Sequence, residues 1–238
     1  MKTSPFSAAA RLASAILLLS ALQLVASAQS AQNDFLSAPE QDVLKELNLA
    51  RTRPGEYAAY LERLRPLYKG LTYEPAPGKA EETQEGWAAV EEAISFLRAS
   101  KPLPPLSASR GMCGGAGELV RDQSKSGATG HKGSDGSFCE ARTMKFGAWS
   151  GPIGENLSYG QLSARDRVIT LLIDDGFSSR GHRKRILDPE YTVAGVACGD
   201  HSTMGSMCVI TIAGGFNDAA TPKNAAPRPA TPKAIRKP

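Results

Sequence analysis

Apolar residues recur every three or four positions in several stretches between residues 37 and 173, and this spacing predicts amphipathic helices. The predicted helices cover Ser37 to Ala50, Tyr57 to Leu64, Trp87 to Leu97, Ser107 to Lys125 and Arg165 to Ile173. The first of them begins with the letters SAPE, which have the S-x-x-E form of a capping box. Between the second and the third, the stretch from Gly70 to Gly86 is rich in glycine, proline and charge, and we expect an exposed loop there.

The pattern changes in the second half of the chain. From Gly127 to Gly160 the sequence is dominated by glycine, serine and asparagine, which predicts a long loop of the kind that is functional or disordered. Tyr191 to Cys198 and Met207 to Ile212 are rich in β-branched and apolar residues and predict a hairpin. Helices that precede a hairpin indicate an α+β domain, in which the helices pack on an antiparallel sheet.

The first residues have the composition of an export signal. Lys2 and Arg11 are followed by an apolar run from Leu12 to Val25 and then by Ala-Ser-Ala, the small-x-small pattern of a signal peptidase site. We expect a signal peptide over residues 1–28, a short lead-in over 29–37 and a domain over 38–216. The apolar run is short for a membrane span and no later segment approaches the required length, so we expect a secreted protein, periplasmic or extracellular, without a membrane span.

Residues 217–238 are rich in proline, alanine and lysine, and we expect a disordered basic tail. The whole chain carries 28 Lys and Arg against 24 Asp and Glu, but the two terminal segments supply seven of the basic residues and one acidic residue. The remainder therefore has a net charge of −2, which argues against a nucleic-acid-binding domain. The tail either contacts an anionic cell envelope or serves as a solvated tail, and its composition fits both.

The chain contains four cysteines, and in an exported protein they indicate disulfides before metal sites. Cys198 and Cys208 flank the expected hairpin turn and would lie opposite each other. We expect these two to pair, and this leaves Cys113 to pair with Cys139.

Three stretches combine a histidine or a carboxylate with glycine, which lets the backbone turn sharply: GHKGSDGS, GPIGENLSYG and RGHRKRILDP. In this order, with ELNLARTRP before them and AGVACG and MCVITIAGGF after them, they resemble the CAP superfamily of cysteine-rich secretory, antigen 5 and plant pathogenesis-related proteins, in its bacterial secreted form. The resemblance implies an α-β-α sandwich with a central cleft lined by two histidines and two acidic residues.

Matched motif by motif, the resemblance places His131, Glu155 and His182 in the cleft. Many members carry W-x-x-E before the second histidine; here the tryptophan is absent, and either Asp174 or Asp175 would be the fourth cleft residue or a turn residue. Two imidazoles and one carboxylate are a common ligand set for Zn²⁺ or another divalent cation, so His131, Glu155 and His182 are the candidate metal ligands. A second acid could orient a histidine.

Other polar residues have simpler interpretations. Asp135 is expected in an Asx turn, Glu155 could close a loop, and Arg183, Lys184 and Arg185 are expected on a solvated face. His201 lies in the hairpin turn and is expected to be exposed. A hydrolase dyad of Ser178 or Ser179 with His182 would be an alternative, but no G-x-S-x-G motif occurs in the chain.

Three functions remain open. The first is a secreted protein that is not an enzyme, or a weak one, and whose cleft binds an unknown small or lipid-like ligand or a divalent metal, as the resemblance implies. The second is a metal-dependent hydrolase that acts on peptide or cell-wall bonds through a metal-bound water. The third is an interaction module with a vestigial cleft, in which the tail or the loop from Gly70 to Gly86 does the binding.

Overall fold

The computed structural model describes residues 34–219. The predicted signal peptide over 1–28 and most of the predicted tail lie outside this range. The elements below belong to the unit that begins at Ser37. None of the helices between residues 34 and 219 is long and apolar enough to cross a membrane.

Five of the seven α-helices in residues 34–219 lie where the apolar spacing predicts them, and the two six-residue helices have no counterpart in the prediction. The helices are α2 (Ala38–Thr52), α3 (Pro54–Glu62), α4 (Trp87–Ala99), α5 (Arg110–Ser126), α6 (Cys139–Met144), α7 (Ala164–Ile173) and α8 (Gly181–Ile186), with a 3-10 turn η1 (Arg65–Leu67). The predicted capping box is present at the start of α2, where the Glu40 carboxylate accepts a hydrogen bond of 2.8 Å from the backbone N–H of Ser37.

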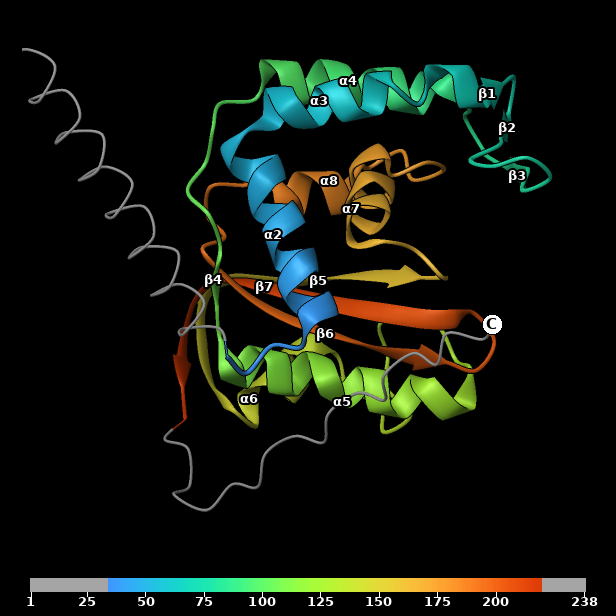
Figure 1. Cartoon of the computed structure of the whole chain (residues 1–238). Coiled ribbons are helices and arrows are strands. Elements are labelled where there is room, and N and C mark those ends of the chain that lie inside the picture. Colours follow the sequence, from blue (N-terminus) through green and yellow to red (C-terminus); the bar gives the residue numbers. More distant parts are fainter. Residues whose placement is uncertain (1–33, 220–238) are drawn as a thin grey trace, which may run out of the picture. The chain divides into compact units, whose positions relative to one another are not determined.

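The central sheet has the strand order β4-β6-β7-β5. Its strands are β4 (Ser107–Ala108), β5 (Gly147–Tyr159), β6 (Val193–His201) and β7 (Gly205–Asp218). Strands β6 and β7 form the predicted hairpin, β5 pairs antiparallel with β7, and the short β4 adds a parallel pair to β6. Helices α5 and α6 lie on one face of the sheet, and α2, α7 and α8 lie on the other (Figure 1). This is the predicted α-β-α sandwich, with a sheet that is antiparallel except for β4.

The core between α5 and the sheet is built from small and medium apolar side chains. Ala116, Leu119 and Val120 of α5 pack against Ala197, Met207 and Val209 of the hairpin. Glycine lets the helix approach the sheet closely, because a Cβ on Gly195 of β6 would lie 2.2 Å from a backbone atom of Met112. These contacts hold α5 across β6 and β7.

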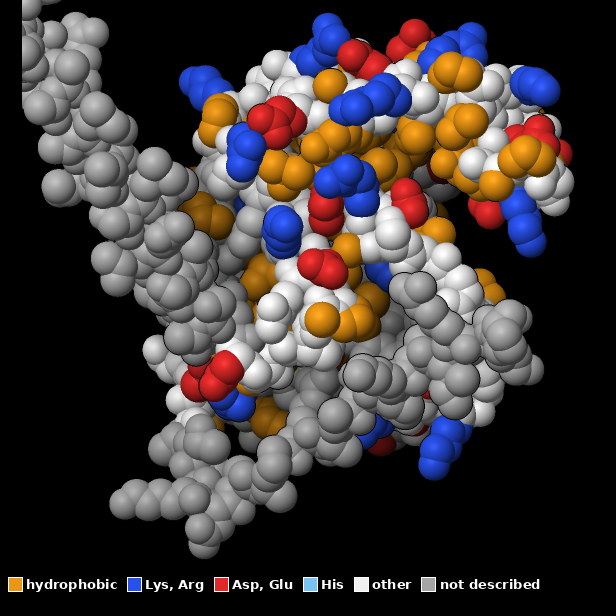
Figure 2. Space-filling view, viewed as in Figure 1, with side chains coloured by type: hydrophobic (Ala, Val, Ile, Leu, Met, Phe, Trp, Pro, Cys, Tyr) orange, Lys and Arg blue, Asp and Glu red, His pale blue; other side chains and the backbone are white. Residues whose placement is uncertain are grey.

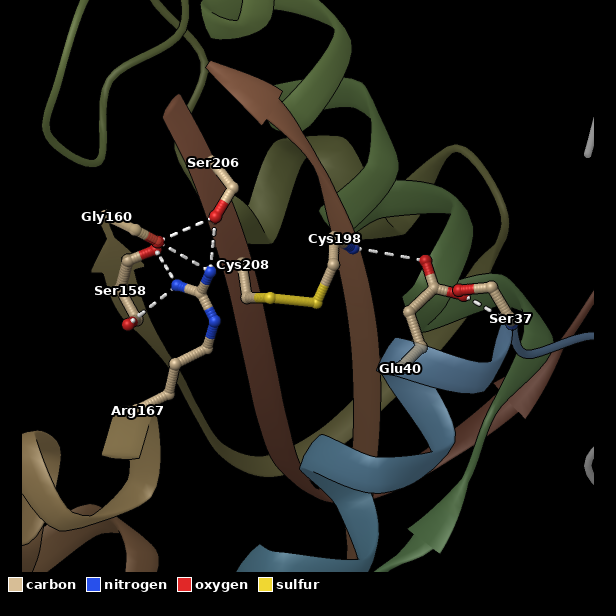
Figure 3. The surroundings of a disulfide bond; sticks show 8 residues. All are labelled: Ser37, Glu40, Ser158, Gly160, Arg167, Cys198, Ser206 and Cys208. Atoms are coloured by element: carbon tan, nitrogen blue, oxygen red, sulfur yellow. Dashed lines mark hydrogen bonds between the residues drawn. A yellow bond between two sulfur atoms is a disulfide. The ribbon is translucent and has the colours of Figure 1, made fainter. Parts of the chain in front are cut away.

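The disulfide between Cys198 and Cys208 is formed as predicted and joins directly opposite positions of β6 and β7 (Figure 3). On one side of it, the backbone N–H of Cys198 donates to Glu40 of α2 at 3.1 Å. On the other side, Arg167 of α7 donates to the carbonyl oxygens of Ser158 and Gly160 and to the hydroxyl of Ser206. The hairpin is thus tied both to α2 and to the end of β5.

The predicted disulfide between Cys113 and Cys139 is wrong, because both residues are buried thiols that form no disulfide. Cys113 faces the sheet, where its Sγ accepts a hydrogen bond from the backbone N–H of Val196 at 3.3 Å. The side of α5 that packs against α6 carries Gly115 instead. A Cβ at this position would lie 2.9 Å from the backbone of Thr143. Cys113 therefore lies on a different side of α5 from the one that meets α6, the helix that carries Cys139, since residues two apart on a helix point in different directions.

The stretch from Gly127 to Gly160 differs most from its prediction as a long loop, because it contains α6 and the 13-residue strand β5. The end of the domain differs slightly as well: β7 continues to Asp218, two residues beyond the expected boundary at 216. Oδ1 of Asp218 accepts hydrogen bonds from the Ser109 hydroxyl and the Gly111 N–H at the start of α5. Residues 217 and 218 therefore belong to the sheet.

The stretch from Gly70 to Gly86 is largely exposed, as expected, but it is not without structure. It contributes to a small sheet of β1 (Tyr68–Lys69), β2 (Thr72–Tyr73) and β3 (Glu81–Glu82), paired in that order. Figure 2 shows Lys and Arg side chains interspersed with Asp and Glu over this end of the molecule and over α3 and α4. This face therefore carries charges of both signs and, among the residues that the structure describes, no patch of a single sign.

Candidate functional site

The first histidine and carboxylate form a pair at strand β5. The side chain of Glu155 is 2% exposed, whereas that of His131 is 45% exposed. Nδ1 of His131 lies 3.0 Å from Oε1 of Glu155. Because a carboxylate only accepts hydrogen bonds, Nδ1 is the donor, and the lone pair of the neutral ring is on Nε2.

Arg142 of α6 holds this pair together and was not identified from the sequence. Its guanidinium donates to Oε2 of Glu155 at 2.8 Å and to the carbonyl oxygens of His131 and Ser137 at 3.1 and 2.8 Å. Arg142 and Glu155 are both buried. A buried carboxylate requires a cation or several donors, so a glutamate in the cleft itself indicates that a cation or several donors lie nearby.

The second pair joins α7 to α8. Nδ1 of His182 lies 2.6 Å from Oδ1 of Asp174, and the backbone N–H of His182 donates to Oδ2 of the same carboxylate at 2.9 Å. The Asp174 side chain is 1% exposed and that of His182 is 23% exposed. Burial acts to raise the pKa of Asp174, but the hydrogen bonds and the charge of His182 outweigh it and hold the pKa below its usual value.

The structure distinguishes the two candidate aspartates. Asp174 contacts His182, whereas the carboxylate of Asp175 accepts hydrogen bonds from the backbone N–H groups of Gln84 and Glu85 at 2.7 and 2.8 Å. Asp175 thus fixes the loop after β3 and is not paired with a histidine. The shorter side chain of Asp174, compared with the glutamate of the W-x-x-E pattern, is still long enough to reach the imidazole.

The segments that carry the two pairs are connected at the free edge of the sheet. Strand β5 is an edge strand, and Arg185 of α8 donates to the backbone carbonyl of Glu155 at 3.2 Å and to Oδ1 of Asn156 at 2.6 Å. Nδ2 of Asn156 in turn donates to the carbonyl of His182 at 3.3 Å. Gly154 makes room for this contact, because a Cβ there would lie 2.3 Å from Nε of Arg185. The G-E-N motif therefore connects the two histidine-bearing segments.

The predicted metal ligands do not form one ligand group. In residues 34–219 no cluster of three or more His, Cys, Asp or Glu side chains is arranged to hold a metal ion. Glu155 binds Nδ1 of His131 and the guanidinium of Arg142, so it acts as the partner that orients a histidine. The imidazoles of His131 and His182 remain as the donors that the site could offer to a cation.

The prediction that His201 is exposed is wrong, because the side chain is buried beside the end of α5. Nε2 of His201 lies 2.9 Å from the carbonyl oxygen of Ala128 and therefore donates, while Nδ1 accepts from the backbone N–H of Met204 at 3.2 Å. Both ring nitrogens are used by the backbone, so His201 is a structural residue of the hairpin turn.

The basic run around His182 is only partly solvated, which corrects the prediction for Arg183. That side chain is fully buried and donates to Glu92 of α4 at 2.7 Å, whereas Lys184 is exposed. Ser178 and Ser179 lie in an exposed turn. Asp135 is in an Asx turn as predicted, with Oδ1 accepting from the N–H of Ser137 at 2.9 Å.

A pocket of about 240 Å³ lies next to Arg142 and is separate from the two imidazoles. Its charged lining is of both signs and includes Glu118, Asp122, Asp135 and Lys145, and neither histidine lines it. We therefore do not assign it to the candidate site.

The family model for the cysteine-rich secretory protein family, CAP, matches residues 91–212. No curated protein matches the chain at a significant level. Among solved structures, an extracellular protein of Bacillus anthracis that contains an SCP domain is 19% identical over 47% of this chain and 34% of that one, with a TM-score of 0.38. An outer surface protein of Borrelia burgdorferi is 13% identical over 53% of this chain and 86% of that one, with a TM-score of 0.40.

This chain therefore spans about a third of the length of the Bacillus anthracis protein. The family model, in contrast, covers the segment from α4 to β7, which contains both histidine–carboxylate pairs and the G-E-N motif. The chain belongs to the cysteine-rich secretory protein (CAP) family.

Proposed function

We propose that this protein is an exported CAP-domain protein that binds a small ligand through its two histidine–carboxylate pairs. The observation that carries the proposal is the shared arrangement of the pairs. In each, a buried carboxylate holds Nδ1 of a partly exposed imidazole, at 3.0 Å for His131 and 2.6 Å for His182. Neutral rings held in this way present Nε2, with its lone pair, to a ligand.

Export is supported by three observations. The sequence begins with a signal-peptide pattern, the family consists of secretory proteins, and the disulfide between Cys198 and Cys208 is formed. Structural disulfides persist mainly in oxidising compartments. The periplasm and the extracellular space both satisfy this requirement.

The ligand that fits these groups has a polar end and an apolar part. The Nε2 atoms accept a hydrogen bond from a polar group or bind a cation, and the ring of Phe177 packs edge-on against His182 with centroids 5.5 Å apart. Phe177 is 59% exposed, so its face is available to an apolar group. This combination favours a lipid-like molecule over a purely polar one.

A divalent cation would find only two protein ligands at this site within residues 34–219. Two imidazole nitrogens are available, and because the described residues offer no group of three ligands, other donors would have to come from the ligand or from water. We therefore propose no metal-dependent hydrolysis. The serine alternative receives no support either, since Ser178 and Ser179 lie in an exposed turn.

The proposal is tested by calorimetric titration of zinc, and separately of palmitate, into the parent, His131→Ala, His182→Ala and Phe177→Ser. We expect each histidine variant to weaken zinc binding at least about tenfold, and Phe177→Ser to weaken palmitate binding while it leaves zinc binding unchanged. Ser178→Ala is the matched control, because Ser178 is exposed and close to His182 in sequence. Equal binding of both probes by all five proteins would refute the proposal.

A further inference from the structure

The backbone of the segment that presents His182 is unusual. In residues 34–219 the non-glycine residues with positive φ are Asp174 and Arg180, at 56° and 51°. Asp174 ends α7, and Arg180 precedes α8. Residues other than glycine rarely adopt this conformation, and it persists only where the surrounding structure enforces it. The segment 174–180, which we call the site loop, is thus held in place at both ends.

The side chain of Arg180 makes the contacts that hold the site loop. It is 9% exposed. Within the loop its guanidinium donates to the carbonyl oxygens of Asp174 and Phe177, at 2.8 and 3.3 Å. Outside the loop it makes a two-point contact with Glu85, with both distances 2.6 Å, and it donates to Glu92 from Nε and Nη2 at 2.9 and 2.7 Å. Because Nε and both Nη atoms of Arg180 donate hydrogen bonds, the planar guanidinium fixes the orientation of the loop carbonyls relative to the two glutamates and also neutralises negative charge.

The partner segment makes reciprocal contacts with the site loop. Asp175 accepts the backbone N–H groups of Gln84 and Glu85, while Oε1 of Glu85 accepts the N–H of Gly176 at 2.8 Å. Hydrogen bonds from Arg180 and from Gly176 hold the pKa of Glu85 at about 2, so this carboxylate stays charged at ordinary pH. Two stretches some ninety residues apart in sequence are therefore joined by backbone and side-chain contacts in both directions.

From these contacts we infer that Arg180, through Glu85 and Glu92, is a positioning residue for the proposed binding site. It holds the site loop so that the Asp174 carboxylate meets Nδ1 of His182, and Nε2 of His182 is presented to the ligand. The segment after β3 then supports the site and is not an independent binding module. This inference rests on the proposed function only for the identity of the site, since the positioning itself is a property of the unliganded protein.

The test uses ¹⁵N-histidine NMR on the unliganded protein at about pH 8, where imidazoles are largely neutral. The variants are Glu85→Gln, which removes the charge without a change of size, and Arg180→Gly, which removes the guanidinium but suits the positive φ. In the parent we expect the Nδ1–H tautomer of His182 and a ring-to-ring NOE between Phe177 and His182. In both variants we expect the tautomer to shift toward Nε2–H and the NOE to be lost.

Two internal comparisons separate positioning from general destabilisation. The His131 signals should stay unchanged in both variants, because that ring is held by Glu155. The control variant is Glu62→Gln, which removes another ion pair made by α4, with Arg98, and should leave the His182 signals as in the parent. Unchanged His182 signals in either variant, or changes that spread equally to His131 or occur in Glu62→Gln, would overturn the inference.

Titration of zinc into the same proteins separates this inference from the proposed function. We expect affinity to fall about tenfold or more in Glu85→Gln and Arg180→Gly, and to stay unchanged in Glu62→Gln. If the parent bound neither zinc nor palmitate, the proposed function would fail, while the NMR result would still decide whether Arg180 positions His182.

Discussion

Replacement of Arg142 is the sharpest test of how the first histidine pair is held. Arg142→Met removes the donor to Glu155 and the two hydrogen bonds to the carbonyl oxygens of His131 and Ser137. Methionine is long and apolar, so the side-chain volume is largely retained. The variant therefore measures the loss of charge and hydrogen bonds more than the creation of a cavity.

The magnitude follows from burial. The side chains of Arg142 and Glu155 are each 2% exposed, so the variant leaves a carboxylate in the interior without its cation. Removal of one partner from a buried ion pair typically costs about 3–5 kcal/mol. A domain of this kind is stable by about 5–15 kcal/mol, so the loss would be a large fraction of the total.

The matched comparison is Lys145→Met at the end of the same helix. Lys145 forms an ion pair of 2.8 Å with Glu118, but its side chain is half exposed. Such surface pairs contribute about 0.2–1 kcal/mol, so Lys145→Met should be nearly neutral. Arg142→Lys, which keeps the charge but not the fork, should fall between the other two variants.

The assay is equilibrium unfolding in urea under non-reducing conditions, followed by tryptophan fluorescence and by circular dichroism. The free energy of unfolding should fall by about 3–5 kcal/mol for Arg142→Met with an unchanged dependence on urea. A loss below about 1 kcal/mol, or equal losses for Arg142→Met and Lys145→Met, would refute the reasoning that this pair is fully desolvated.

Three further predictions concern the disulfide, the Cys139 thiol and Gly195. Joint replacement of Cys198 and Cys208 by serine should lower the free energy of unfolding by about 2–3 kcal/mol, measured in urea, because the disulfide closes a short loop in the unfolded chain. Burial and nearby carboxylates raise the pKa of the Cys139 thiol to about 12, so iodoacetamide at pH 8.5 should alkylate it at least about 100-fold more slowly in the native protein than after denaturation, as followed by mass spectrometry. Gly195→Ala should lower the melting temperature by several degrees, because its Cβ would lie 2.2 Å from the backbone of α5, whereas Gly55→Ala meets nothing within 4 Å and should not lower it.

The helices could be predicted because their buried positions are apolar. In α4, for example, Val90, Ile94 and Leu97 are buried at the spacing that the sequence shows. Strand β5 could not be predicted in this way. Its consecutive buried residues, Gly154, Glu155 and Asn156, are polar or lack a side chain, so they produce no alternation of apolar and polar positions.

The errors at Arg183 and at Cys113 have related causes. Arg183 is buried because Glu92, on a helix far away in sequence, supplies its counter-charge, and a basic run alone contains no sign of that partner. The predicted pairing of Cys113 with Cys139 rests on elimination, which contains no information on which side of α5 faces the sheet. Both facts are set by tertiary packing, which local patterns do not encode.

The three histidines show which local features separate a binding residue from a structural one. His201 is buried, and the backbone uses both of its ring nitrogens, so no lone pair is left for a ligand. His131 and His182 are each bound at Nδ1 by a buried carboxylate and are partly exposed. Among the cations that flank His182 in the sequence, Arg180 and Arg183 are paired with glutamates of the preceding segments, and Arg185 contacts Glu155 and Asn156. These three arginines therefore build the scaffold around His182, and Asp174 is the charged group that contacts the imidazole.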